Sequence, residues 1–166
     1  MSTNLLEVNN VHAGYVKDLN ILQGINFRIA PGELVAVIGP NGAGKTTTFY
    51  MMVGLIRPEN GNIFLDGEDI VKFPMYKRAQ RGISYLPQEP SIFRKLSVED
   101  NLRAVLEIKG LGKEEIESEV ERLLKEFNLL EFSKRDGYKL SGGERRKTEI
   151  AKAIAIKPLF ILFDEP

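Results

Sequence analysis

The 166-residue sequence contains no cysteine, which excludes disulfide bonds and cysteine-ligated metal sites. It has no excess of either charge, because 23 basic residues balance 23 acidic ones, so no broad attraction to nucleic acid or anionic membrane is implied. No apolar run approaches the roughly 18 residues of a membrane span, and residues 1–10 lack the pattern of a secretory signal. We therefore expect no nucleic-acid partner and membrane contact only through other proteins.

A glycine-rich segment matches the phosphate-binding pattern G-x-x-x-x-G-K-[ST] in full. The run before it, Leu34–Ile38, is apolar and largely β-branched, which predicts a strand buried on both faces of a parallel sheet. The residues after Lys45 predict a helix. In this context backbone N–H groups and the helix dipole favour phosphate binding. The candidate nucleotide-binding residues are Gly39, Pro40, Asn41, Gly42, Ala43, Gly44, Lys45, Thr46 and Thr47.

Two side chains of this segment have specific expected roles. Lys45 reaches the β- and γ-phosphates, and the Thr46 hydroxyl occupies one Mg²⁺ position. The alternative is a glycine-rich turn between strand and helix that binds no ligand, which the surrounding pattern disfavours.

The sequence ends with a second apolar run, Phe160–Phe163, followed by Asp164, Glu165 and Pro166. Beside a phosphate loop, such a strand end places one acid on the metal and one beside the attacking water. We expect Asp164 to bind Mg²⁺ and Glu165 to act as general base or to orient the water. An ordinary turn before proline is the alternative.

A second glycine pair lies in the segment Leu140–Glu144. Ser141 is a candidate helix N-cap, with Glu144 completing a capping box. A serine hydroxyl and the N–H groups of a helix start also form an anion site, so both roles are compatible.

The phosphate loop, Gln88, the Leu-Ser-Gly-Gly-Glu signature and the acidic strand end occur in an order and spacing that resemble the nucleotide-binding domain of ATP-binding cassette (ABC) proteins. The resemblance runs from about residue 5 to the last residue. It implies an α/β P-loop NTPase of the ABC ATPase type, with an N-terminal antiparallel β subdomain, a parallel-sheet core and a helical insert. It also implies ATP and Mg²⁺ as ligands.

The resemblance assigns roles across a pair of subunits. A second copy of the chain would complete a head-to-tail sandwich of two ATP molecules, in which Ser141, Gly142 and Gly143 face the γ-phosphate of the partner's ATP. Tyr15 would stack on adenine, although a surface or core tyrosine is the alternative. Gln88 would contact Mg²⁺ and the attacking water, and would act in catalysis with Lys45 and Glu165.

Within the family, the resemblance narrows to the cytoplasmic ATPases of bacterial lipopolysaccharide export transporters. It implies a peripheral location on the inner face of the inner membrane. Phe93 and Arg94 are the candidate contacts for transmembrane subunits, with burial in the chain's own helical insert as the alternative. Thr148 and Lys152 depart from the valine and arginine of the pattern, away from the phosphates. The ATPase of a branched-chain amino-acid importer and a nucleotide-binding fragment without turnover are the alternative functions.

We expect one incomplete domain with three regions. Residues 4–32 and 63–67 form the antiparallel β region, with a hairpin turn at Asp66-Gly67. Residues 33–90 and 157–166 form the core, and residues 91–156 the helical subdomain. Within the subdomain Ser97 caps one helix, and a second carries an apolar stripe and a solvated glutamate face. The stripe residues are Ile116, Val120, Leu123, Leu124 and Phe127; the glutamates are Glu114, Glu115, Glu117, Glu119 and Glu121.

The family continues beyond the acidic pair with a strand that ends in a histidine at the γ-phosphate. The only histidine here, His12, precedes the phosphate loop and is expected at the surface. We therefore expect a fragment of a longer protein whose sheet has an exposed edge.

Overall fold

The structure is a computed structural model that describes residues 5–16 and 19–164. Its contacts divide the chain into two compact units, Met1–Ile83 and Ser84–Pro166. We describe each unit by itself. The residue boundaries that we expected for the three regions of the domain stay predictions.

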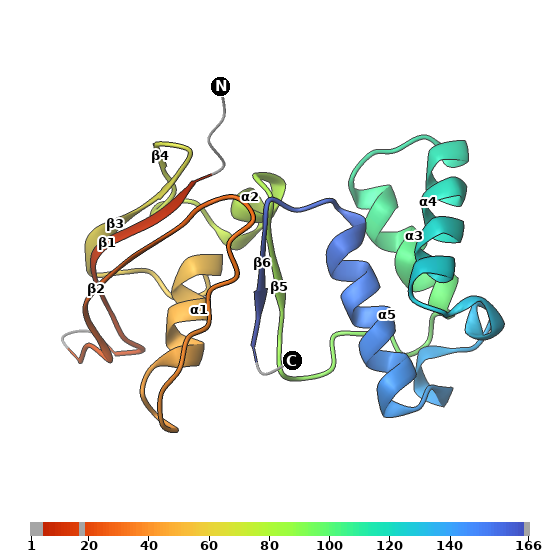
Figure 1. Cartoon of the computed structure of the whole chain (residues 1–166), viewed down its shortest axis with the longest axis horizontal. Coiled ribbons are helices and arrows are strands. Elements are labelled where there is room, and N and C mark those ends of the chain that lie inside the picture. Colours follow the sequence, from red (N-terminus) through yellow and green to blue (C-terminus); the bar gives the residue numbers. More distant parts are fainter. Residues whose placement is uncertain (1–4, 17–18, 165–166) are drawn as a thin grey trace. The chain divides into compact units, whose positions relative to one another are not determined.

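The N-terminal unit contains a four-stranded sheet in the order β2-β1-β3-β4 (Figure 1). All its pairings are antiparallel, which confirms the predicted antiparallel β subdomain. Buried side chains alternate in each half of β1, Leu6 with Val8 and Val11 with Ala13, because successive residues of a strand point to opposite faces, and the register shifts between the halves. The strands are β1 (Leu6–Ala13), β2 (Leu22–Ile29), β3 (Asn60–Leu65) and β4 (Glu68–Asp69).

The predicted hairpin turn at Asp66-Gly67 is confirmed, and it joins β3 to β4. Both residues have positive φ angles, 52° and 80°, as a type I′ turn requires. His12, which we expected at the surface, lies in β1 and is half-buried, so this expectation is confirmed only in part.

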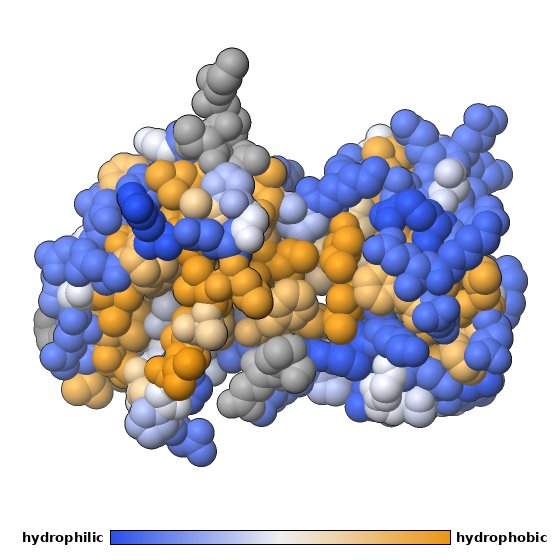
Figure 2. Space-filling view, in the orientation of Figure 1, coloured by the Kyte–Doolittle hydropathy of each residue, from blue (hydrophilic) through white to orange (hydrophobic). Residues whose placement is uncertain are grey.

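The prediction of a buried parallel strand at Leu34–Ile38 is wrong for the residues that the structure describes. The segment belongs to neither sheet, and Leu34 and Ile38 are 98% and 91% exposed. Figure 2 shows apolar surface exposed over the N-terminal unit. The physical reason is that a strand exists only through hydrogen bonds to a neighbouring strand, and no described strand pairs with this segment.

Helix α1 (Lys45–Val53) follows the phosphate loop, and α2 (Met75–Gln80) packs near its end. Gly54 ends α1 in the left-handed conformation, where its N–H donates to the Met51 carbonyl. Arg78 of α2 also caps carbonyls of this last turn. Its Nη1 donates to the Met51 and Met52 oxygens at 2.8 Å each, and the side chain is almost completely buried.

The C-terminal unit contains three helices and most of a two-stranded sheet. Strands β5 (Ile83–Leu86) and β6 (Phe160–Phe163) pair side by side and run in the same direction (Figure 1). Helices α3 (Val98–Ile108), α4 (Lys113–Glu126) and α5 (Gly142–Ala155) pack around one apolar cluster, and 3₁₀ turns span Leu130–Phe132 and Gly137–Lys139. Among the described residues, no helix combines the length and the apolar character that a bilayer crossing requires.

The predicted features of these helices are confirmed. Ser97 caps α3, since its Oγ accepts a hydrogen bond from the Asp100 N–H at 3.1 Å. The apolar stripe of α4 joins the core cluster. Four of the five glutamates are exposed and Glu119 is half-buried, and ion pairs join Glu117 to Arg103 and Glu121 to Lys125.

Candidate functional site

The phosphate loop lies in the N-terminal unit and ends at the start of α1. Gly42 and Gly44 have φ angles of 81° and 90°, a region that side-chain-bearing residues avoid. A Cβ atom on Gly44 would also approach Leu22 Cδ2 to 2.9 Å. Gly44 is the N-cap residue of α1 and has no side chain to accept from the first N–H groups of the helix. The loop thus directs backbone donors and the positive end of a helix dipole to one place.

The Lys45 ammonium lies inside this loop. Its Nζ donates to the carbonyl oxygens of Gly39 at 2.8 Å and Pro40 at 3.0 Å. A cation beside the positive end of a helix dipole favours an anion with several oxygens, so the residues present fit a nucleotide phosphate chain. Thr46, the next residue, lies in the first turn of α1.

Tyr15 lies beside the phosphate loop in the same unit. The Thr47 hydroxyl donates to the Tyr15 hydroxyl at 3.4 Å, and the tyrosine side chain is exposed. Gly14, the residue before Tyr15, lies close to the main chain of Leu19. A Cβ atom there would lie 2.0 Å from the Leu19 carbonyl oxygen, so only glycine fits this position. The structure therefore brings Tyr15 and the loop together, and stacking on adenine stays a prediction.

Gln88 and Asp164 lie at the same edge of the two-stranded sheet, because β5 and β6 end side by side. The Asp164 N–H donates to the Leu86 carbonyl at 3.1 Å, and Gln88 follows Leu86 by two residues. Asp164 is buried, and the Tyr85 hydroxyl donates to its Oδ2 at 3.1 Å. Tyr85 therefore orients the carboxylate that the sequence assigns to Mg²⁺. The predicted role of Glu165 falls outside the described residues.

The signature forms the N-terminus of α5. Ser141 Oγ accepts from the Glu144 N–H at 3.3 Å, and Glu144 Oε2 accepts from the Ser141 N–H at 2.8 Å, so the predicted capping box is confirmed. The hydrogen bond from the Ser141 N–H lowers the pKa of Glu144. This box fixes the direction of the Ser141 side chain at the helix start.

Gly142 and Gly143 face open space in this chain. Outside the backbone of α5 itself, a Cβ atom on either residue would meet no atom of the described residues within 4 Å. Glycine inside a helix costs about 0.5–1 kcal/mol relative to alanine, and no close contact with the part of the chain that the structure describes requires glycine at these two positions. The two glycines thus leave room for a group that approaches from outside the chain.

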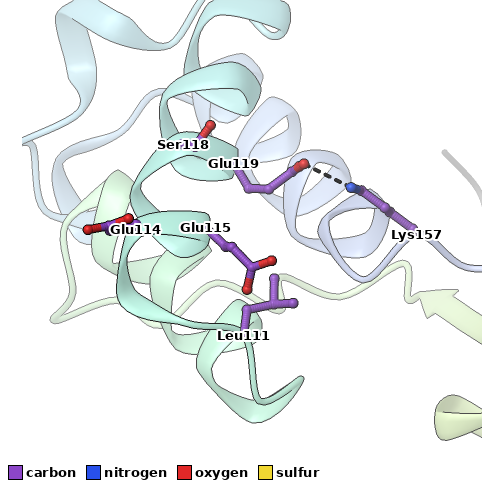
Figure 3. A pocket seen from close by; sticks show the side chains of 6 residues that line it. All are labelled: Leu111, Glu114, Glu115, Ser118, Glu119 and Lys157. Carbon is purple, nitrogen blue, oxygen red and sulfur yellow. Dashed lines mark hydrogen bonds and ion pairs between the residues drawn. The ribbon is translucent and has the colours of Figure 1, made fainter.

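A pocket on the C-terminal unit lies away from these motifs, between α4 and the end of α5. Figure 3 shows its lining, with the Glu119–Lys157 ion pair at 2.8 Å across one side. Its other lining residues include Leu111, Glu114, Glu115 and Ser118. Glu115 caps the start of α4 by accepting from the Gly112 N–H at 3.0 Å. These carboxylates therefore stabilise α4, in line with the solvated face that the sequence predicts.

The described residues contain no cluster of three or more His, Cys, Asp or Glu side chains that would hold a metal alone. The predicted Mg²⁺ ligands Thr46, Gln88 and Asp164 instead supply a hydroxyl, an amide and a carboxylate. These oxygen donors suit Mg²⁺, which keeps waters and binds substrate phosphates alongside few protein ligands. Their joint action on one ion stays a prediction.

The sequence analysis missed the residues that hold the segment after Gln88. Asn101, fully buried in α3, accepts from the Phe93 N–H at 2.8 Å and donates to the Ser97 carbonyl at 2.9 Å. From α5, Glu149 and Lys152 bind the backbone of Ser91. The only available signal was polar residues at positions of α3 and α5 that face the core.

Ile92 and Phe93 have different surroundings. Ile92 is buried in the helical core. Phe93 is 48% exposed, and Arg94 is exposed beside it. Phe93 and Arg94 are therefore accessible to a partner, whereas Ile92 is not.

Comparison with known proteins agrees with this arrangement. Residues 22–166 match the family model described as ABC transporter. The chain is 50% identical over 163 residues to the "Lipopolysaccharide export system ATP-binding protein LptB" of Haemophilus influenzae, covering 98% of this chain and 67% of that protein. Identity to the protein of the same name from Acidithiobacillus ferridurans is 49% over 162 residues, with the same coverage of 98% and 67%.

Solved structures show the same fold. A structure described as the ATP binding subunit of an ABC transporter aligns with a TM-score of 0.84 at 33% identity, over 98% of this chain and 66% of that one. CbiO1 of Clostridium perfringens, described as part of the ABC transporter complex cbiONQ, aligns with a TM-score of 0.87 at 27% identity, over 100% and 66%. The chain thus spans about two thirds of the length of these relatives.

The predicted family, the predicted ABC ATPase fold and the predicted similarity to lipopolysaccharide-export ATP-binding proteins are confirmed by these matches. ATP binding and association with transporter subunits follow from the family. The chain belongs to the ABC transporter family, as one of its ATP-binding subunits.

Proposed function

We propose that the complete protein binds and hydrolyses ATP to energise lipopolysaccharide export from the inner membrane. The observation that carries this proposal is the open space at Gly142 and Gly143, beside a signature whose serine is fixed by a capping box. Such a surface serves a phosphate group supplied from outside the chain. The similarity to LptB proteins supports lipopolysaccharide as the exported substrate.

Two copies would bind head to tail, with ATP held by the phosphate loop of one and covered by Ser141 of the other. Lys45 would hold the β- and γ-phosphates. Thr46, Gln88 and Asp164 would hold Mg²⁺, which neutralises charge that develops on the phosphates. Glu165 would take the proton of the attacking water or orient it. Tyr15 would stack on the adenine ring.

Transporter subunits would dock near Phe93 and Arg94. An exposed aromatic ring beside an arginine suits a protein interface, where aromatic residues and arginine are enriched. This arrangement would hold the protein at the cytoplasmic face of the inner membrane through its partners.

The experiment is to purify the complete protein with its co-purifying membrane subunits and to measure phosphate release. We expect ATP turnover, abolished by Lys45→Ala, and membrane subunits of a lipopolysaccharide exporter. Co-purification with subunits of a branched-chain amino-acid importer would refute the assigned substrate. ATP binding without phosphate release would refute the enzymatic role.

A further inference from the structure

Three charged side chains of α5 point to the segment that follows Gln88. Arg146, Glu149 and Lys152 are spaced three residues apart, so they lie along one face of the helix. Arg146 Nη1 donates to the Pro87 carbonyl at 3.0 Å. Arg146 thus contacts the residue just before Gln88, and Glu149 and Lys152 contact the chain after it.

Ser91 is held at both of its backbone polar groups. Its N–H donates to Glu149 Oε1 at 2.8 Å, and its carbonyl accepts from Lys152 Nζ at 2.8 Å. The same ammonium lies 4.0 Å from the centre of the Phe93 ring, a cation–π contact. Two side chains of α5 therefore fix one loop residue and orient the exposed ring next to it.

Glu149 also forms an ion pair with Arg146, whose Nη1 lies 3.4 Å from Glu149 Oε2. Glu149 is 3% exposed, and burial lowers the pKa of Lys152. The contacts of α5 with the core come from other residues, Ala151 and Ala155. Among the described atoms, Arg146 Nη2 is buried and has no hydrogen-bond partner, so one donor of the guanidinium group stays unused.

The other end of α5 presents the signature. The helix is continuous from Gly142 to Ala155, and Ser141 caps it. A movement of Ser91 that carries Glu149 therefore also carries Ser141, since a helix moves as a rigid element.

We propose that Glu149 and Lys152 are positioning residues that fix the segment after Gln88 to α5, so that a displacement at Phe93 moves the signature serine. The inference rests on the proposed function, in which Phe93 meets a partner and Ser141 meets ATP. This role of Lys152 and Glu149 does not require either side chain to contact the nucleotide.

The test uses the complete protein in complex with its membrane subunits. In Glu149→Ala the Ser91 N–H loses its acceptor, and we expect kcat for ATP to fall about tenfold while KM changes less than twofold. Glu149→Gln retains an acceptor oxygen and should restore most of kcat. Lys152→Met keeps the apolar stem but loses the bond to the Ser91 carbonyl, and should give an intermediate loss.

Amide hydrogen exchange supplies a second readout that does not depend on turnover. Exchange at Ser91 should accelerate in Glu149→Ala and remain slow in Glu149→Gln, with helix α4 unchanged in both. Glu121→Ala, which removes an exposed carboxylate paired with Lys125, is the matched control and should keep wild-type kcat and exchange.

The outcomes separate the two proposals. An inactive wild-type complex would refute the proposed function alone. An active wild-type complex in which Glu149→Ala keeps its kcat, or in which Glu149→Gln fails like alanine, would overturn the inference. Accelerated exchange throughout α3, α4 and α5 in both Glu149 variants would assign the residue to folding and would overturn it too.

Discussion

At the scale of single residues, helices α1 and α5 have different kinds of N-cap. Gly44 provides a left-handed N-cap that has no side chain to cap α1. Ser141 instead satisfies one donor of α5 itself and keeps its hydroxyl fixed through Glu144. The first kind suits a tightly held phosphate chain, and the second suits a ligand that arrives with a partner.

Glu144 makes the stability of the capping box at the start of α5 depend on pH. Its pKa is lowered from 4.5 by the Ser141 N–H, so its ionised form stabilises the folded state above the unfolded pKa, and this contribution is lost as the pH falls through the folded pKa. Glu144→Gln retains the cap but not the charge. We expect wild type to have the higher Tm at pH 7, and the difference to vanish well below pH 4.5. A difference in Tm that is independent of pH would contradict this role.

The sequence motifs predict residues whose chemical type suits phosphate or metal, such as Lys45 and Ser141, and these roles stay predictions. They did not reveal Glu149, Asn101 or Arg78, because these side chains bind main-chain atoms. Every residue except proline offers the same backbone donor and acceptor, so such partners leave no pattern of residue types along the chain.

At the scale of elements, patterns predicted local structure better than pairing. The apolar stripe of α4 and the caps of α3 and α5 depend on neighbours within one helix, and all are confirmed. The run Leu34–Ile38 has the composition of a buried strand but is exposed and unpaired in the structure. An apolar composition indicates that a segment needs burial, whereas a strand also needs a hydrogen-bonded partner, which is not fixed by the neighbouring sequence.

Arg78 links the end of α1 to α2. Besides the Met51 and Met52 oxygens, it donates to the Phe73 and Val71 carbonyls at 3.0 Å each, and burial lowers its pKa to about 10. Arg78→Met would remove these buried hydrogen bonds to main-chain carbonyls, and we expect a loss of about 3 kcal/mol in the free energy of unfolding. Urea denaturation of the complete protein measures this.

The matched control is Arg81→Met at the end of the same helix, which removes an exposed ion pair with Glu68. Exposed pairs contribute little, so we expect the urea midpoint of the control to stay near that of wild type. Equal losses in the two variants would show that the buried cap of α1 has no special role.

At the scale of the whole molecule, the proposed function requires a second copy, because it assigns Ser141 to ATP held by a partner. Ser141→Arg would place a long cation at the start of α5, outside the phosphate loop of its own chain. We expect the complete protein with this change to bind ATP with unchanged affinity as a monomer and to lose ATP turnover. Fluorescence titration with an ATP analogue and a phosphate-release assay check the two statements.

The control for this variant is Ser118→Arg, the same change at an exposed position of α4. It should retain turnover. A loss of nucleotide binding by monomeric Ser141→Arg would mean that the signature belongs to the chain's own nucleotide site.

The most direct test of the central claim is the mass in solution of the complete protein carrying Glu165→Gln, measured by light scattering with and without ATP and Mg²⁺. Loss of the general base should slow hydrolysis about 100-fold or more and preserve the ATP-bound state. The account predicts a monomer without nucleotide and a dimer with ATP, and no dimer when Ser141→Arg is added. A Glu165→Gln protein that binds ATP and remains monomeric would contradict it.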